Sequence, residues 1–271
     1  MPFADLGDVR LFYTDEGDGV PSLLLIHGWT CDSHDWSWQI GAFADSHRVI
    51  AADSRGHGRS GTTEGGYAPR TFADDLASLV ESLGAAPVVA IGHSVGGAIA
   101  SALAVEHPAL VRAVVVVDPA YGVDGDRTLF IADVLRGLRG SSPVEGLDYA
   151  LDVLEAPTTP RPLRIWHRRR ALGTEWHVAI DTLAGTYEAE GQFGQRSESE
   201  QYLRGRRCPV LAIYANADRA AWEATIQIHP YSRQVVFNGS GHFLHQERPD
   251  QFNALVLDWI AGLPDGASPT A

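Results

Sequence analysis

Apolar residues in this chain gather in short continuous runs, separated by longer stretches of mixed polarity. Runs rich in valine, isoleucine and leucine are typical of strands that are buried on both faces of a parallel sheet. The loosely alternating segment 8–13 is a candidate edge strand. The buried strands predicted from the continuous runs are 22–26, 48–52, 88–91, 111–117, 209–215 and 233–237.

Between these runs, the apolar positions follow a helical period. In the segment 71–83, Phe72, Leu76 and Leu79 recur on one helical face, and Gly84 follows as a stop signal. The other helices predicted between and after the strands are 33–44, 97–105, 219–228 and 251–261. Strands that alternate with helices in this way predict an α/β fold with a doubly wound, mostly parallel sheet.

The pattern changes in the middle of the chain. No strand run occurs between the predicted strands 111–117 and 209–215, a connection too long for one crossover helix. We therefore expect a core formed by residues 1–120 and 206–271 and a helical cap, or lid, formed by residues 121–205. The alternative is that these helices flank the sheet like the others. The helices predicted in this region are 128–138, 144–154, 164–172 and 176–187, and a frayed polar tail is predicted for 264–271.

Composition narrows the class of protein. The 271 residues are 45% hydrophobic and 20% charged, as in soluble globular proteins. The net charge of −13 argues against nucleic acid or an anionic membrane surface as partners. Two cysteines are too few for a disulfide framework or a zinc site, so we expect no metal and no cofactor. With no signal-peptide pattern and no bilayer-spanning run, a cytoplasmic monomer or homodimer is expected.

The strand 88–91 ends in the motif Gly92-His93-Ser94-Val95-Gly96, and an alanine-rich helix follows. A G-x-S-x-G motif between a strand and a helix predicts a nucleophile elbow, in which the serine sits on a sharp turn. Glycine at both ends of the motif removes the Cβ atoms that would clash there. The alternative is an ordinary glycine-rich turn between a strand and a helix.

A serine nucleophile needs a base, and histidine suits this role near neutral pH. Eleven histidines compete. His242 follows a late predicted strand inside a glycine-rich loop, which can bring its ring to the carboxyl edge of the sheet. His27 and His57 lie in other loops at that edge and are the rival candidates. We expect His242 to be the base.

Two aspartates could orient that histidine. Asp118 follows the strand after the elbow, and Asp218 follows the strand before His242. Both give the chain order serine, aspartate, histidine. Each also has a structural alternative, because Asp118 could cap the turn next to Pro119 and Asp218 could cap the helix predicted at 219–228. The residues themselves leave this choice open.

The backbone N–H groups of Val95 and Trp29 are the candidate donors of an oxyanion hole, since one follows the serine and the other lies in the loop after an early strand. Trp29 is also a candidate wall of the substrate pocket. We expect the substrate to be an apolar or aromatic small molecule, although packing between cap and core explains the cap aromatics equally well. The other candidate substrate-binding residues are His93, Trp166, Trp176 and Tyr187.

Taken together, the motifs resemble the α/β-hydrolase superfamily along nearly the whole chain. They are His27-Gly28-Trp29, the segment 53–60, Gly92 to Gly97, and Gly241-His242. The resemblance implies Ser94 as nucleophile and His242 as base. It favours Asp218 as the acid, because most members carry the acid after the corresponding strand. A minority, including zearalenone lactonases and cofactor-free quinolone dioxygenases, carry it where Asp118 stands.

A serine at the elbow separates this chain from the haloalkane dehalogenases and epoxide hydrolases of this fold, which carry aspartate there. The expected activity is therefore that of a serine hydrolase, which cleaves a small to medium carboxylic ester or lactone through an acyl-enzyme. The alternatives are a cofactor-free dioxygenase, a hydrolase of carbon–carbon bonds, and a catalytically silent ligand-binding receptor.

Overall fold

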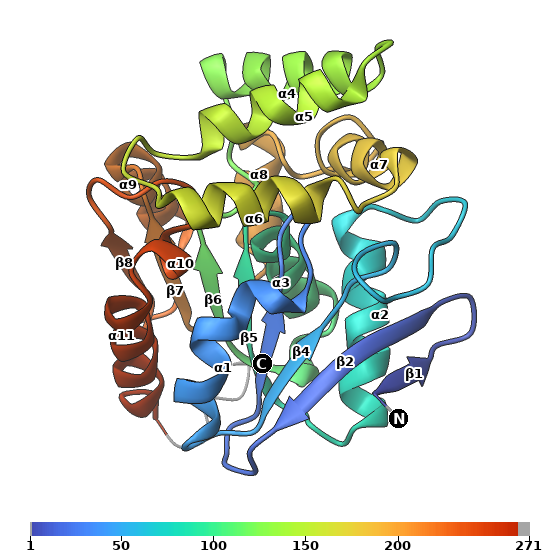
Figure 1. Ribbon diagram of the computed structural model, residues 1–271. Coiled ribbons are helices and arrows are strands. Elements are labelled where there is room, and N and C mark those ends of the chain that lie inside the picture. Colours follow the sequence, from blue (N-terminus) through green and yellow to red (C-terminus); the bar gives the residue numbers. More distant parts are fainter. Residues whose placement is uncertain (1, 265–271) are drawn as a thin grey trace.

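The computed structural model describes residues 2–264, which form one eight-stranded sheet with the order β1-β2-β4-β3-β5-β6-β7-β8 (Figure 1). All neighbouring strands from β4 to β8 in this order are parallel, and β1 and β2 pair antiparallel at one edge. The strands are β1 (Phe3–Asp5), β2 (Arg10–Glu16), β3 (Leu23–Ile26), β4 (Val49–Ala52), β5 (Val88–His93), β6 (Val111–Val117), β7 (Val210–Tyr214) and β8 (Arg233–Val236).

The predicted strands are present, and the doubly wound α/β fold class is confirmed. Strands β3, β4, β5 and β7 are buried at every position, which explains why their sequences are continuous apolar runs. The short strand β1 lacks such a run and is only partly buried, so hydrophobic patterning did not predict it.

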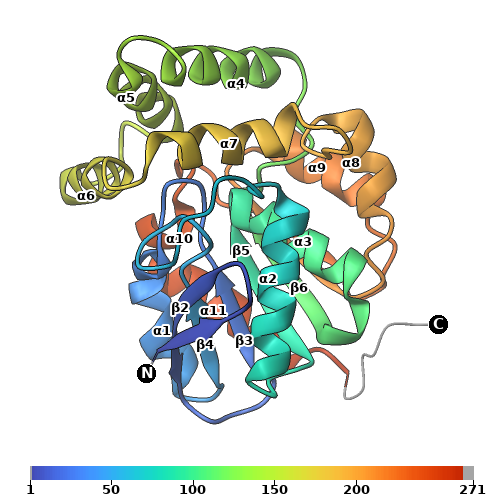
Figure 2. The same cartoon turned by 90° about the vertical axis from the view of Figure 1, so that its right-hand side faces the viewer.

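Helices cover both faces of the sheet (Figures 1 and 2). One face packs against α1 (Ser37–Ala44) and α11 (Pro249–Ala261), with Phe43 and Phe252 fully buried between them and the strands. The opposite face packs against α2 (Pro69–Ser82), α3 (Val95–Glu106) and α9 (Ala217–Ile226). Shorter helical turns are η1 (Ser33–Trp36), η2 (Pro108–Leu110) and α10 (Leu244–Glu247).

Between β6 and β7 the chain is helical. Helices α4 (Gly125–Leu138), α5 (Pro143–Leu154), α6 (Arg161–Ala171) and α7 (Trp176–Tyr187) lie over the carboxyl end of the sheet, and we call them the cap helices (Figure 1). Helix α8 (Arg196–Leu203) was not predicted, because its sequence is mostly polar; it packs against α3. The division of the chain into core and cap domains stays a prediction.

Polar contacts join the cap helices to the sheet end. The indole N–H of Trp29 donates to the carbonyl oxygen of Ala179 in α7 at 2.8 Å. The side chain of Arg170 in α6 pairs with Asp35, and both are buried. Among the described helices, none combines the length and the apolar character that crossing a membrane requires. Cys31 and Cys208 form no disulfide, and both are buried.

The polar tail was predicted to fray over residues 264–271. All of these residues except 264 lie outside the described part of the chain.

Candidate active site

Ser94 lies at the junction of β5 and α3, where the chain turns sharply. Its φ of 54° is in the left-handed region, which non-glycine residues rarely adopt and which clusters at functional sites. A Cβ atom added at Gly92 would collide with the backbone of Gly96, and one added at Gly96 would collide with the backbone of Ile26. The two glycines of the motif therefore serve the close approach of backbone that the elbow requires.

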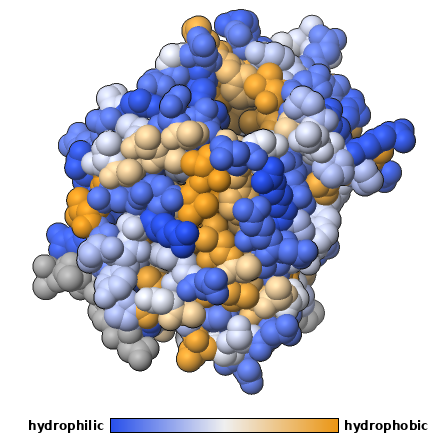
Figure 3. All heavy atoms as spheres, turned by 90° about the vertical axis from the view of Figure 1, so that its left-hand side faces the viewer, coloured by the Kyte–Doolittle hydropathy of each residue, from blue (hydrophilic) through white to orange (hydrophobic). Residues whose placement is uncertain are grey.

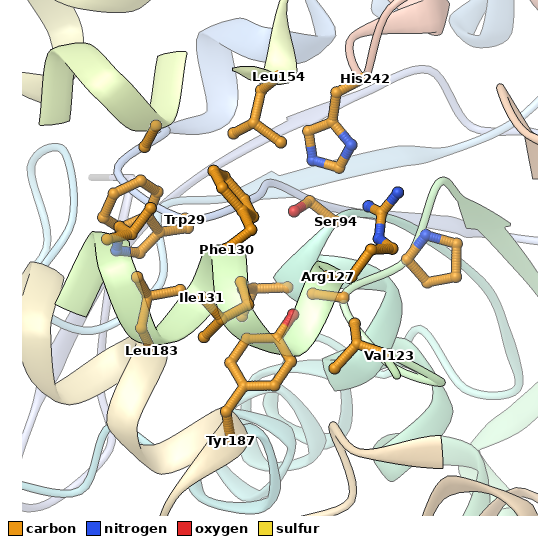
Figure 4. A pocket seen from close by; sticks show the side chains of 15 residues that line it. Trp29, Ser94, Val123, Arg127, Phe130, Ile131, Leu154, Leu183, Tyr187 and His242 are labelled. Atoms are coloured by element: carbon orange, nitrogen blue, oxygen red, sulfur yellow. The ribbon is translucent and has the colours of Figure 1, made fainter. Parts of the chain in front are cut away.

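His242 lies in the loop between β8 and α10, and a carboxylate holds its imidazole ring at the Nδ1 atom. Its Nδ1 atom is 2.6 Å from Oδ2 of Asp118, which follows β6. The backbone of His242 is held too, since its N–H donates to Leu154 O at 2.9 Å and its carbonyl accepts from His93 Nε2 at 3.0 Å. In Figure 4 the His242 ring lies above Ser94, and both line one pocket.

Asp118 is built to remain a carboxylate. Its φ is 40°, so it is a second strained non-glycine residue at this edge of the sheet. Its Oδ1 atom accepts from Arg219 Nη1 at 3.0 Å, while Oδ2 faces His242. Burial alone would raise the pKa of the Asp118 carboxyl, but the charge of Arg219 and the hydrogen bond to His242 hold that pKa well below its ordinary value.

The expectation that Asp218 orients His242 is wrong for this structure. Asp218 is exposed in the first turn of α9, and the side chain of Asn216 caps that helix by accepting from Arg219 N at 3.0 Å. Because α9 begins directly after β7, Asp218 is turned outward, and the next residue, Arg219, points inward to Asp118. The alternative candidate, Asp118, therefore occupies the position beside His242.

The loop after β3 supplies the remaining groups. Within residues 2–264, the backbone N–H groups of Trp29 and Val95 form no hydrogen bond. This is what we expect of donors that bind an oxyanion of the substrate. Thr30, the next residue, has a φ of 53°.

The rival base His27 is engaged elsewhere, since its Nε2 accepts from Ser54 N at 2.9 Å. His57 is buried, and its Nδ1 donates to Arg55 O at 2.9 Å. Neither ring lines the pocket of Ser94 and His242.

A pocket lies between Ser94 and the cap helices. Figure 3 shows that the upper part of the molecule is hollowed and that hydrophobic side chains lie in the hollow. Three titratable residues line the pocket, namely His242, Arg127 and Tyr187. The apolar residues of this wall are Trp29, Val95, Pro119, Ala120, Val123, Phe130, Ile131, Val134, Ala150, Leu154 and Leu183.

Of the predicted substrate-binding residues, Trp29 and Tyr187 line this pocket. Trp166 and Trp176 do not. The ring of Trp166 packs against that of Trp38, with 5.2 Å between the ring centroids, and Trp176 is half-buried against the core. Residue type alone suggests these aromatics as pocket residues, because helical spacing does not reveal which face of a cap helix is turned toward the site.

His93 is buried behind the serine and lines a smaller neighbouring cavity. Its Nε2 holds the His242 loop, which makes it a support for that loop in this structure. Sequence analysis missed Arg127, Phe130, Leu154 and Leu183, which the cap helices bring over Ser94. One signal was available for Arg127, because a cation near the start of a predicted helix opposes the helix dipole.

One buried group of residues has the composition of a metal site. Ligand atoms of Asp35, His93 and His245 lie within 4.8 Å of one another. However, Arg170 already pairs with Asp35, and His93 Nε2 is engaged by His242 O. Because the Arg170 guanidinium already neutralises the Asp35 carboxylate, we assign no metal to this group of residues.

Comparison with known proteins finds relatives along almost the whole chain. The chain is 36% identical to the 2-(acetamidomethylene)succinate hydrolase of Mesorhizobium japonicum, over 94% of this chain and 93% of that protein. It is 27% identical to the non-heme haloperoxidase of Rhodococcus erythropolis, over 96% and 99%. The solved structure of a thermophilic esterase from Thermogutta terrifontis superposes with a TM-score of 0.80 at 25% identity, covering 95% of both chains.

The model of one enzyme family matches most of the chain, from residue 23 to residue 255, and includes Ser94, Asp118 and His242. That family is described as the alpha/beta hydrolase family. With the fold and the relatives in agreement, this chain belongs to the alpha/beta hydrolase family, a family of hydrolytic enzymes.

Proposed function

We propose that this protein hydrolyses a carboxylic ester or lactone through an acyl-enzyme formed on Ser94. The observation that carries the proposal is the contact of 2.6 Å between His242 Nδ1 and the Asp118 carboxylate, on the far side of a ring that faces Ser94. A carboxylate at Nδ1 holds the proton there, which leaves Nε2 unprotonated and able to act as a base.

In the first half of the reaction, His242 Nε2 takes the proton of the Ser94 hydroxyl. The Oγ atom bonds to the substrate carbonyl carbon, and the carbonyl π electrons move to its oxygen. The free N–H groups of Trp29 and Val95 are the donors for that oxyanion, and each such donor stabilises the transition state by about 3 kcal/mol. Asp118 stabilises the imidazolium that forms.

In the second half, the oxyanion re-forms the carbonyl, and the bond to the alkoxy oxygen breaks. That oxygen takes the proton from His242 Nε2 and leaves as the alcohol; in a lactone it stays tethered to the acyl chain. Water, deprotonated by His242, then attacks the acyl carbon, and the same steps release the carboxylic acid and regenerate Ser94.

The test is a turnover panel of p-nitrophenyl esters and γ- and δ-lactones. It also holds 2-(acetamidomethylene)succinate, the compound in the name of the Mesorhizobium relative. Ser94→Ala should lower kcat by at least about 10⁴-fold. The matched control is Ser101→Ala, a buried serine further along α3 whose hydroxyl donates to Gly97 O at 2.9 Å. Full turnover by the Ser94 variant would exclude the acyl-enzyme.

The position of Asp118 keeps one alternative in view, because the cofactor-free dioxygenases that the chain resembles carry their acid at this place. In that reaction a histidine–aspartate pair deprotonates the substrate, and the serine is not a nucleophile. Oxygen consumption that survives Ser94→Ala would favour it. Covalent labelling of Ser94 by a fluorophosphonate would favour the hydrolase. If the protein shows neither labelling nor turnover, a ligand-binding receptor is the remaining alternative. Turnover of β-diketone acids would indicate carbon–carbon hydrolysis.

A further inference from the structure

Arg127 is out of place in an otherwise apolar pocket wall. It lies in the first turn of α4, and Figure 4 shows its guanidinium turned into the pocket toward Ser94 and His242. Its neighbours along the same helix, Phe130 and Ile131, also line the pocket and are apolar. Its charge contributes to the lowered pKa of Asp118, after Arg219 and His242, but no step of the proposed function contacts Arg127, so its place in the pocket calls for a further explanation.

The guanidinium of Arg127 has no partner in the described part of the chain. Within residues 2–264 it forms neither a hydrogen bond nor an ion pair. Arg127 is half-buried, whereas the two buried arginines nearby are paired: Arg206 with Glu223 at 2.6 Å and Arg219 with Asp118 at 3.0 Å. An arginine stays charged at any relevant pH, so taking it partly out of water without a partner costs free energy.

The surroundings of Arg127 make that cost larger. The start of a helix is its positive end, which disfavours a cation and favours an anion. Burial, followed by the charge of Arg219, lowers the pKa of Arg127. The acids that face this corner are already engaged or turned to solvent: Asp118 contacts Arg219 and His242, Glu155 contacts His167 at 2.8 Å, and Asp126 is exposed.

A second polar group points to the same place. Tyr187 of α7 lines the pocket, and its hydroxyl forms no hydrogen bond with any described residue (Figure 4). Burial raises the pKa of this phenol to about 12, so it remains a neutral hydrogen-bond donor at physiological pH. A buried hydroxyl of this kind usually finds a partner.

We propose that the Arg127 guanidinium and the Tyr187 hydroxyl together bind a free carboxylate of the substrate. The substrate would then be an ester, lactone or amide that carries a second, ionised carboxyl group, such as a half-ester of a dicarboxylic acid. The planar fork of arginine matches the two oxygens of a carboxylate, and the apolar residues of the pocket wall would hold the carbon chain of the substrate. The reaction part rests on the proposed function, and the binding part does not.

The test compares two substrates that differ by one charge: mono-p-nitrophenyl succinate and its methyl ester. The readout is the ratio of their kcat/KM values. Arg127→Met should lower this ratio about 10- to 100-fold, and Tyr187→Phe about 3- to 10-fold, as expected for hydrogen bonds to a charged group. The control is Arg136→Met on the same helix, whose side chain is 75% exposed and pairs with Asp133 on the surface; its ratio should not change.

A binding experiment separates this proposal from the proposed function. Monomethyl glutarate is titrated calorimetrically into Ser94→Ala and into Ser94→Ala/Arg127→Met. If neither ester is turned over but only the first variant binds, the carboxylate site stands and the esterase does not. Equal binding by both variants, or an unchanged kcat/KM ratio in Arg127→Met, overturns the carboxylate site.

Thermal stability gives a further readout. If the unpaired cation serves a ligand, Arg127→Met should melt at the same temperature as the unsubstituted protein or about 1–3 °C higher. A lower melting temperature together with an unchanged ratio would assign Arg127 to the fold instead.

Discussion

Replacing Asp118 by asparagine should nearly abolish turnover, whereas Asp218→Asn should leave it within about twofold. Asp118 is buried and has its Oδ2 atom 2.6 Å from His242 Nδ1. An asparagine amide can present its NH₂ group to Nδ1, which moves the imidazole proton to Nε2, where the base must be free. Asp218 is exposed on α9 and contacts neither His242 nor the pocket.

The magnitude follows from the loss of the correct tautomer. Loss of the orienting carboxylate in a serine triad lowers kcat by about 10⁴-fold, which corresponds to about 5.4 kcal/mol of transition-state stabilisation. Activity should be assayed on whichever p-nitrophenyl ester the protein turns over best, with kcat and KM determined separately. We expect the change in kcat, because His242 acts on the bound substrate and not in its capture.

The substitution also touches stability. Asparagine leaves the buried Arg219 without its counter-charge at 3.0 Å, and breaking a buried pair from one side costs about 3–5 kcal/mol. Circular dichroism should therefore accompany the assay. If Asp118→Asn does not fold, the double variant Asp118→Asn/Arg219→Gln removes the stranded charge. A folded variant of either kind that keeps a tenth or more of the kcat would refute the assignment, and so would a 10³-fold loss in Asp218→Asn.

Three further substitutions test the fold around the site. Gly96→Ala should destabilise the protein by about 3 kcal/mol in urea unfolding, because the new methyl collides with the backbone of Ile26; Gly41→Ala, which has open space, is the control. His57 is neutral when folded, since burial and then His27 lower its pKa to about 3, so the unfolded chain takes up a proton below pH 6.5 that the folded chain resists. From pH 7 to pH 5, the unsubstituted protein should lose about 2 kcal/mol more of unfolding free energy than His57→Gln, and equal losses would contradict this. Asp35→Asn should cost about 3 kcal/mol by leaving Arg170 unpaired, against a change below about 0.5 kcal/mol for the exposed pair of Arg168 and Asp148 in Arg168→Gln.

Local sequence determined the fold class and the positions of Ser94 and His242, the proposed nucleophile and base. Apolar runs predicted the buried strands because a strand covered on both faces needs an apolar residue at every position. The elbow around Ser94 was predictable because its glycines answer a local steric demand, which the collisions at Gly92 and Gly96 make visible. His242 was predictable for a related reason: parallel strands bring their carboxyl ends to one edge.

Tertiary structure alone decided the acid and the pocket. The sequence offers a carboxylate after β6 and another after β7, and both satisfy the same chain order. What separates them is the start of α9, where capping by Asn216 turns Asp218 to solvent and sends Arg219 inward to Asp118. That difference of one position along a helix rotates a side chain by about 100°, which no strand-end argument resolves.

The cap shows the same limit more strongly. Helical periods located the cap helices, but they did not reveal that Arg127 lines the pocket. Nor did they show that, of the three cap aromatics chosen, Tyr187 lines it while Trp166 and Trp176 do not. A helix that packs on several neighbours has more than one apolar stripe, so its sequence does not show which stripe covers the sheet and which lines a cavity. Ser94 and His242, the proposed nucleophile and base, are thus encoded in short motifs. The acid and the substrate-facing groups depend on how distant helices are rotated when they pack.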